Sequence, residues 1–144
     1  MTVLEQENKL ACSADVAWQV LADFGNFLAW ATGGAGTARL EGEGVGMVRH
    51  LDIPELGSVS ERLDSLDANQ RILAYSMVSV EMIGMSQYSA TVRVVEEGDA
   101  QCVLQWRGEF ETVPGANSNE VRESLAGSYS MMSQGLQTYC RELG

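Results

Sequence analysis

The chain has 144 residues, 45% hydrophobic and 20% charged, a composition that fits one globular domain with a single core. Its formal net charge of −11 argues against nucleic acid and anionic membrane surfaces as partners, because both carry negative charge. No apolar run approaches the ~20 residues that cross a bilayer, so we expect no integral membrane association.

The cysteines and the first ten residues bear on the cellular compartment. Cys12, Cys102 and Cys140 match no metal-binding spacing, and their odd number argues against a disulfide framework. The first ten residues carry charges and no apolar segment, so we do not expect a signal peptide. The sequence therefore predicts buried, reduced thiols and a cytoplasmic protein with no metal and no cofactor.

The first part of the chain predicts one strand and two short helices. Thr2 to Ala11 alternate partly between apolar and polar residues, as strands do. Ser13 can cap the amphipathic helix that follows, which Gly25-Asn26 ends. Phe27 to Trp30 predict a second helical turn, and three glycines then redirect the chain.

Six further strands follow, separated by turns rich in glycine, aspartate and asparagine. Their predicted ranges are Thr37 to Glu41, Gly46 to Ile53, Ser58 to Leu66, Arg71 to Ser79, Gln87 to Glu96 and Gln101 to Thr112.

The last part of the chain predicts one long helix over about 119–142. Apolar residues recur at spacings of three and four from Val121 to Leu143, and Ser118 or Asn119 can cap the first turn. Only the inner face of the sheet is available to cover this apolar stripe.

Together these elements predict an α+β fold. A curved seven-stranded antiparallel sheet should wrap around the long C-terminal helix, with two short helices between strands 1 and 2. We expect residues 1–144 to form a single ligand-binding domain. A sheet this curved leaves space beneath the helix, where small molecules commonly bind.

Four segments carry a resemblance to a known family: Val16 to Trp30, Gly44 to Arg49, Ser60 to Asp67 and Arg71 to Ser76. They resemble the START-like (helix-grip, SRPBCC) superfamily, in particular its polyketide cyclase/dehydrase and lipid-transport branch. The resemblance covers nearly the whole chain and implies a cavity for a hydrophobic ligand. It does not choose a function, because the superfamily includes carriers, receptors, cyclases and co-chaperones.

Glu61 is the most informative single residue. By alternation it shares the concave face with Val59, Leu63 and Ser65. A carboxylate among apolar neighbours must be paired, hydrated or protonated. It is either a polar anchor or acid/base group for a ligand, or the partner of an arginine near the rim.

Arg49 follows the parity of Ile53 on the preceding strand. It either pairs with Glu61, holds an anionic group of a ligand, or reaches solvent at the sheet edge. His50 has the opposite parity and should face outward, with no nucleophile motif near it in the sequence. Catalysis based on histidine is therefore not expected.

The remaining predicted ligand-binding residues are apolar or aromatic side chains on the faces that meet beneath the helix. They are Ile53, Leu56, Leu63, Tyr75, Met77, Tyr88, Tyr129 and Met132. Each one taken alone fits ordinary core packing equally well. As a group they indicate a lined cavity, because inward tyrosine hydroxyls need partners. The segments Ile53 to Gly57 and Val80 to Ser86 flank one end and are candidates for a lid.

The sequence predicts binding of a hydrophobic or amphipathic small molecule, by a carrier, a sensor or a sequestering protein. Two alternatives stay open. One is a polyketide cyclase- or dehydratase-like enzyme in which Glu61 moves protons. The other is a protein-interaction module whose interior is filled by side chains.

Overall fold

A computed structural model describes residues 1–55, 57–80 and 84–143 of the chain. Its elements follow the predicted order. They are β1 (Thr2–Leu10), α1 (Ala14–Ala22), the 3-10 helix η1 (Phe24–Asn26), α2 (Phe27–Ala31), β2 (Thr37–Glu41), β3 (Val48–Ile53), β4 (Gly57–Asp67), β5 (Ile72–Val80), β6 (Met85–Glu96), β7 (Cys102–Thr112) and α3 (Ser118–Leu143). The bounds of the strands differ from the predicted ones by at most two residues.

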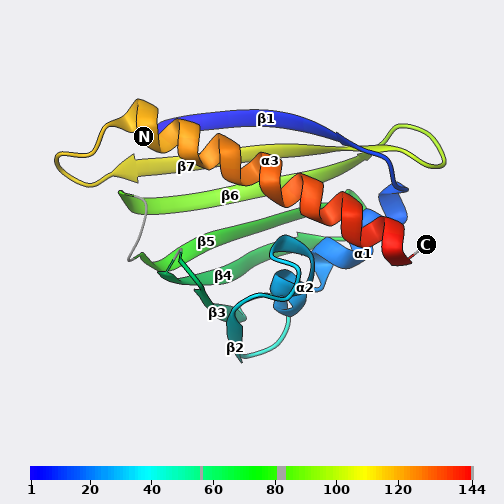
Figure 1. Ribbon diagram of the computed structural model, residues 1–144, viewed down its shortest axis with the longest axis horizontal. Coiled ribbons are helices and arrows are strands. Elements are labelled where there is room, and N and C mark those ends of the chain that lie inside the picture. The colour runs from blue at the N-terminus through cyan, green and yellow to red at the C-terminus, as the bar shows by residue number, and fades with distance from the viewer. Residues whose placement is uncertain (56, 81–83, 144) are drawn as a thin grey trace.

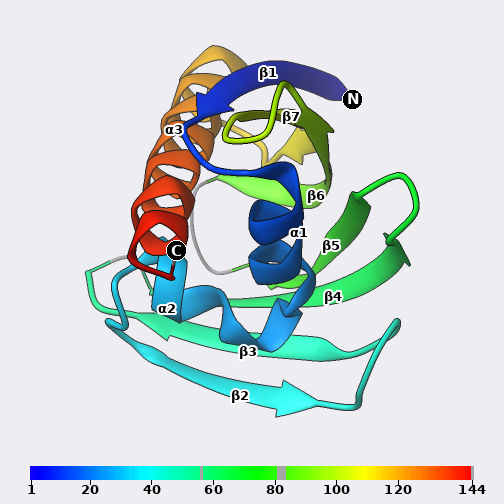
Figure 2. The ribbon, with the colours of Figure 1, turned by 90° about the vertical axis from the view of Figure 1, so that its right-hand side faces the viewer.

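The strands form one antiparallel sheet in the order β1-β7-β6-β5-β4-β3-β2. Helix α3 lies across this sheet, and the sheet curves so that β2 and β3 pass beneath α1 and α2 (Figures 1 and 2). The predicted α+β fold, with seven strands wrapped around a long C-terminal helix, is confirmed.

A change of register in β4 helps the sheet to bend. The pairing of β4 with β5 shifts between Ser60 and Glu61 and again between Leu63 and Ser65. Such irregularities bend a strand and interrupt its alternation of faces. Glu61 and Leu63 are buried as predicted, but Ser65 is exposed, so its predicted place on the concave face is wrong.

Side-chain caps begin the two longer helices. The Ser13 hydroxyl accepts a hydrogen bond from the Val16 amide at 3.3 Å, as predicted for α1. For α3 the cap is Asn117 rather than Ser118 or Asn119, since its Oδ1 accepts from the amides of Asn119 and Glu120 at 2.9 and 3.2 Å. An asparagine just before the first turn satisfies two amides that lack helical partners.

Helix α3 buries one face along most of its length. Its buried residues are Val121, Leu125, Tyr129, Ser133, Leu136 and Cys140. Leu143, at the end of the predicted apolar stripe, is instead 60% exposed. None of the described helices is long and apolar enough to span a membrane.

Substitution by alanine should have opposite effects on stability at two glycines in α3. A β-carbon at Gly135 would lie 2.5 Å from the backbone oxygen of Trp30 in α2, whereas no described atom lies within 4 Å of one at Gly127. We expect Gly135→Ala to lower the free energy of unfolding by about 1–3 kcal/mol, because α2 must move away. Gly127→Ala should raise it by about 0.5–1 kcal/mol through helix propensity alone. Urea denaturation measures both, and equal effects of the two substitutions would contradict the close packing of α2 on α3.

Candidate functional site

A cavity of about 400 Å³ lies between the concave face of the sheet and helices α2 and α3. Strands β3 to β6 supply one wall and the two helices supply the other. Most of the lining side chains are apolar, and the charged ones are Arg49 and Glu61. A volume of this size falls within the roughly 300–1,000 Å³ typical of small-molecule sites.

Most of the predicted ligand-binding residues lie on the walls of this cavity. They are Arg49, Ile53, Glu61, Tyr75, Met77, Tyr88 and Met132. Leu63 and Tyr129 are instead fully buried in the core outside the lining. Leu56 lies outside the described residues, as do positions 81–83 of the proposed lid segment Val80 to Ser86.

The prediction missed several lining residues. These are Phe27, Ala31 and Thr32 around α2, Leu51 and Val59 on the strands, and Leu125, Ser128 and Met131 on α3. Strand alternation identifies Leu51 and Val59, since they share faces with Arg49 and Glu61. No sequence signal identifies the α2 residues, because their position depends on how a short helix docks.

Arg49 and Glu61 form a buried ion pair across β3 and β4. They are directly opposed in the sheet, and Nε and Nη2 of Arg49 lie 2.9 and 2.8 Å from Oε1 of Glu61. The two residues are only 5% and 8% exposed. The alternative prediction, that the Arg49 side chain reaches solvent at the sheet edge, is therefore wrong.

Backbone and aromatic contacts complete the surroundings of Arg49. Its Nη1 donates to the backbone oxygen of Phe24 at 3.1 Å. The guanidinium carbon also lies 3.8 Å from the ring centre of Phe24 and 4.2 Å from that of Phe27. Aromatic faces attract a cation, most strongly where water is excluded. These contacts hold the guanidinium in one place, and its bonds to Glu61 fix that carboxylate in turn.

The ion pair predicts a specific pattern of stability. We expect Arg49→Met to lower the free energy of unfolding by about 3–5 kcal/mol, because it leaves the Glu61 carboxylate buried without a counter-charge. The double variant Arg49→Met, Glu61→Leu should recover most of this loss. Arg62→Met, which breaks the exposed pair with Asp64, should cost below about 1 kcal/mol. Urea denaturation of the three variants checks the pattern, and similar losses from Arg49→Met and Arg62→Met would contradict it.

Three tyrosine hydroxyls form a buried chain beside the cavity. The hydroxyl of Tyr88 lies 3.2 Å from that of Tyr75 and 2.6 Å from that of Tyr129. The Tyr129 ring stacks on Trp106 with centroids 4.6 Å apart, and the indole of Trp106 donates to Ser133. Burial is the main cause that raises the pKa of all three tyrosines above the ordinary value of 10.0.

The raised tyrosine pKa values predict a loss of stability at high pH. The folded protein holds the three hydroxyl protons more tightly than the unfolded chain does. Their contribution to the free energy of unfolding is therefore complete below about pH 10 and falls as the pH rises further. Unfolding free energies measured by urea from about pH 8 to about pH 11 should show the decline. Tyr88→Phe should flatten it, since one titrating group is removed. If the free energy of unfolding of Tyr88→Phe fell with the same slope, ionisation of the three tyrosines would not be the cause of the decline.

The three cysteines, far apart in the sequence, influence one another in the fold. All are free and buried. Burial raises the pKa of Cys102 and of Cys140 from 9.0 to about 12, and the nearby thiol of Cys12 adds to both shifts. Such thiols stay protonated and unreactive near neutral pH. Among the described residues, no group of three or more His, Cys, Asp or Glu side chains is placed to hold a metal ion.

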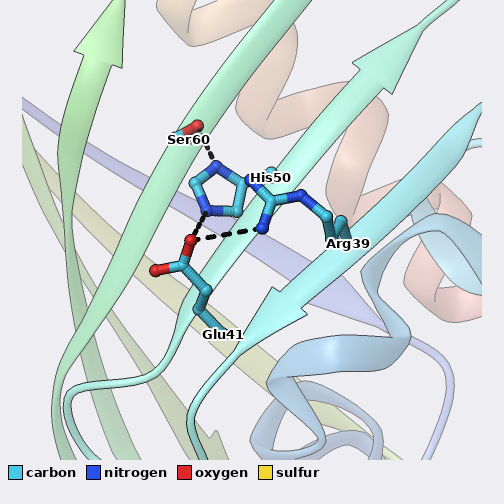
Figure 3. A network of polar contacts seen from close by, with 4 residues as sticks. All are labelled: Arg39, Glu41, His50 and Ser60. Atoms are coloured by element: carbon cyan, nitrogen blue, oxygen red, sulfur yellow. Dashed lines mark hydrogen bonds and ion pairs between the residues drawn. The ribbon is translucent and has the colours of Figure 1, made fainter.

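His50 faces away from the cavity, as predicted, and joins a polar network on the outer face of β2 to β4 (Figure 3). Its Nδ1 lies 2.6 Å from the Ser60 hydroxyl, and its Nε2 lies 3.1 Å from Oε1 of Glu41. Arg39 also donates to that oxygen, at 3.2 Å, and contributes most to lowering the pKa of Glu41, with His50 next.

The contact between Ser60 and His50 was missed because it depends on strand register. Antiparallel pairing places Ser60 directly opposite His50, ten positions away in the sequence. The Glu41 side chain is largely exposed and both ring nitrogens already have partners. We therefore assign the network to the pairing of β2, β3 and β4.

Comparisons with known proteins place the fold. The family model described as "Polyketide cyclase / dehydrase and lipid transport" matches residues 1–141. No curated protein sequence matches the chain.

Several solved structures are similar throughout their length. The protein XoxI from Bacillus cereus is 24% identical with a TM-score of 0.84, and the match covers 99% of this chain and 98% of that one. Norcoclaurine synthase from Thalictrum flavum, in complex with dopamine and hydroxybenzaldehyde, is 23% identical with a TM-score of 0.78, covering 98% and 87%. The Zhui aromatase/cyclase from Streptomyces sp. R1128 is 20% identical with a TM-score of 0.78, covering 97% and 93%. At these identities the structures show a shared fold.

Proposed function

Because the chain belongs to the polyketide cyclase / dehydrase and lipid transport family, we propose that it binds a hydrophobic or amphipathic small molecule. The ligand occupies the space beneath α3, and the protein acts as a carrier, a sensor or a sequestering protein. The observation that carries the proposal is the cavity of about 400 Å³ with mainly apolar walls. A space of this size is larger than the few voids found in an ordinary core.

The walls suit a ligand of variable shape. Met77, Met131 and Met132 face the cavity from both sides, and methionine side chains adapt readily to different apolar surfaces. Met131 is also 70% exposed, so the cavity reaches solvent beside α3. A ligand can therefore enter without unfolding the sheet.

A neutral fluorescent probe tests the proposal directly. We expect N-phenyl-1-naphthylamine to bind with one site per chain and to gain fluorescence as it leaves water, because apolar burial supplies most of its affinity. Met77→Trp should weaken probe binding, because the larger indole occupies part of the cavity. Val78→Trp, one residue along β5 on the exposed outer face, should leave it unchanged.

The matched tryptophan variants give the test its specificity. Both place the same indole on the same strand, so a loss of probe binding in Met77→Trp alone is tied to the side of β5 that faces the cavity. Absence of probe binding to the wild-type protein, or equal binding to the two variants, would exclude the cavity as the ligand site.

A second candidate function is enzymatic. The Glu61 carboxylate lies on the cavity wall, where it could exchange protons with a bound substrate. Two proteins of similar fold are named as a norcoclaurine synthase and an aromatase/cyclase. Glu61 would then be the acid/base group, in the same cavity.

A further inference from the structure

The hydrogen-bonding groups that remain free on the cavity wall restrict the class of ligand. Building on the function proposed above, we propose that the ligand is uncharged and that its polar end carries both a hydrogen-bond donor and an acceptor. Carboxylates such as free fatty acids are rejected, although an arginine lines the cavity.

Glu61 already neutralises the charge of Arg49, and three of the five guanidinium N–H groups are engaged within the protein. Nε and Nη2 both contact Oε1 of Glu61, and Nη1 donates to the Phe24 backbone oxygen. The rings of Phe24 and Phe27 lie close to the guanidinium carbon. An anionic ligand beside Arg49 would share this one buried cation with Glu61, so that two carboxylates would compete for a single positive charge. That competition is unfavourable where water cannot screen like charges.

Glu61 supplies a hydrogen-bond acceptor to the cavity. Both contacts from Arg49 fall on Oε1, and Oε2 has no hydrogen-bond partner among the described residues. No buried side-chain oxygen or nitrogen of the described chain is both enclosed and unsatisfied, so Oε2 must be accessible from the cavity that Glu61 lines. A ligand O–H or N–H can donate to this oxygen. A cationic ligand is not favoured, because the Arg49–Glu61 pair is already neutral.

The tyrosine chain supplies a donor. The Tyr129 hydroxyl is wholly buried, and Tyr88 is its hydrogen-bond partner within the described part of the chain. Its proton must go to Tyr88, because an unpaired buried donor is costly. Two bonds join three hydroxyls, so one proton is left over, and it belongs to Tyr75 or Tyr88. Both of these line the cavity.

The other polar side chains of the lining are already engaged. The Thr32 hydroxyl bonds to backbone oxygens of Leu28 and Ala35 at 2.9 and 2.7 Å. The Ser128 hydroxyl donates to the backbone oxygen of Ser124 at 3.1 Å. The acceptor on Glu61 and the donor of the tyrosine pair therefore remain free on the described walls. A ligand with a matching donor and acceptor satisfies both.

Two isosteric probes separate charge from shape. 2-Naphthamide has an N–H donor and a carbonyl acceptor, whereas 2-naphthoate has the same outline, no donor and a negative charge. We expect isothermal titration calorimetry at pH 7 to show that the amide binds at least about tenfold more tightly than the carboxylate, since the latter leaves buried groups unpaired. Equal or tighter binding of the carboxylate would overturn the proposal.

Three variants locate the effect. Glu61→Gln, checked for folding by circular dichroism, should reverse the preference toward 2-naphthoate, because Arg49 then lacks its counter-charge. The double variant Tyr75→Phe, Tyr88→Phe should weaken amide binding by about fivefold or more, since it removes both hydroxyls that can carry the free donor, whereas either single variant leaves one of them. Tyr139→Phe is the control, because its hydroxyl lies outside the cavity beside Asn26. Unchanged amide affinity in the double variant Tyr75→Phe, Tyr88→Phe would also overturn the proposal.

Failure of the proposed ligand class can be distinguished from failure of the proposed binding function. N-phenyl-1-naphthylamine reports cavity binding by any apolar molecule. If it binds while the amide is not preferred over the carboxylate, the binding function stands and the ligand class proposed here is wrong. If it does not bind, the binding function itself fails.

Discussion

The buried pair of Arg49 and Glu61 is the constraint on which the cavity depends. Neither charge is tolerated alone at that depth, so the two strands that carry them must stay in register. The bond from Arg49 to the Phe24 backbone then ties the sheet to the η1 turn. This ion pair and this hydrogen bond hold the sheet and the short helices together, and the space between them is not filled by side chains.

The contact of α3 with strands β6 and β7 is of a different kind. Tyr129 projects from α3 onto the sheet, stacks on Trp106 and bonds to Tyr88. The part of α3 around Tyr129 packs tightly against the sheet. The tyrosine hydroxyls lie at the boundary between this packed core and the cavity. The same hydroxyls fix α3 relative to β5 and β6 and present a donor to the cavity. The proposed ligand recognition therefore uses residues that also stabilise the fold.

The balance of charge in the cavity connects structure to function. An arginine in an apolar pocket suggests an anion site when it is considered alone. Here its partners are all within the protein, and the pair as a whole is neutral. A pocket with a neutral polar end and flexible methionines is suited to holding uncharged amphipathic molecules. The same pocket can support proton transfer if the ligand has a reactive group beside Glu61.

The sequence by itself determined the order and type of the elements, the long amphipathic helix and the inward parity of Arg49, Glu61 and Tyr75, because local periodicity reports which face of an element is buried. It did not determine that Arg49 pairs with Glu61 rather than reaching solvent, that Ser60 meets His50, or that Tyr129 lies outside the lining. Those facts depend on strand register, on the irregular pairing of β4 and on where α2 docks. Such features arise from contacts between distant segments, and only the tertiary structure decided them.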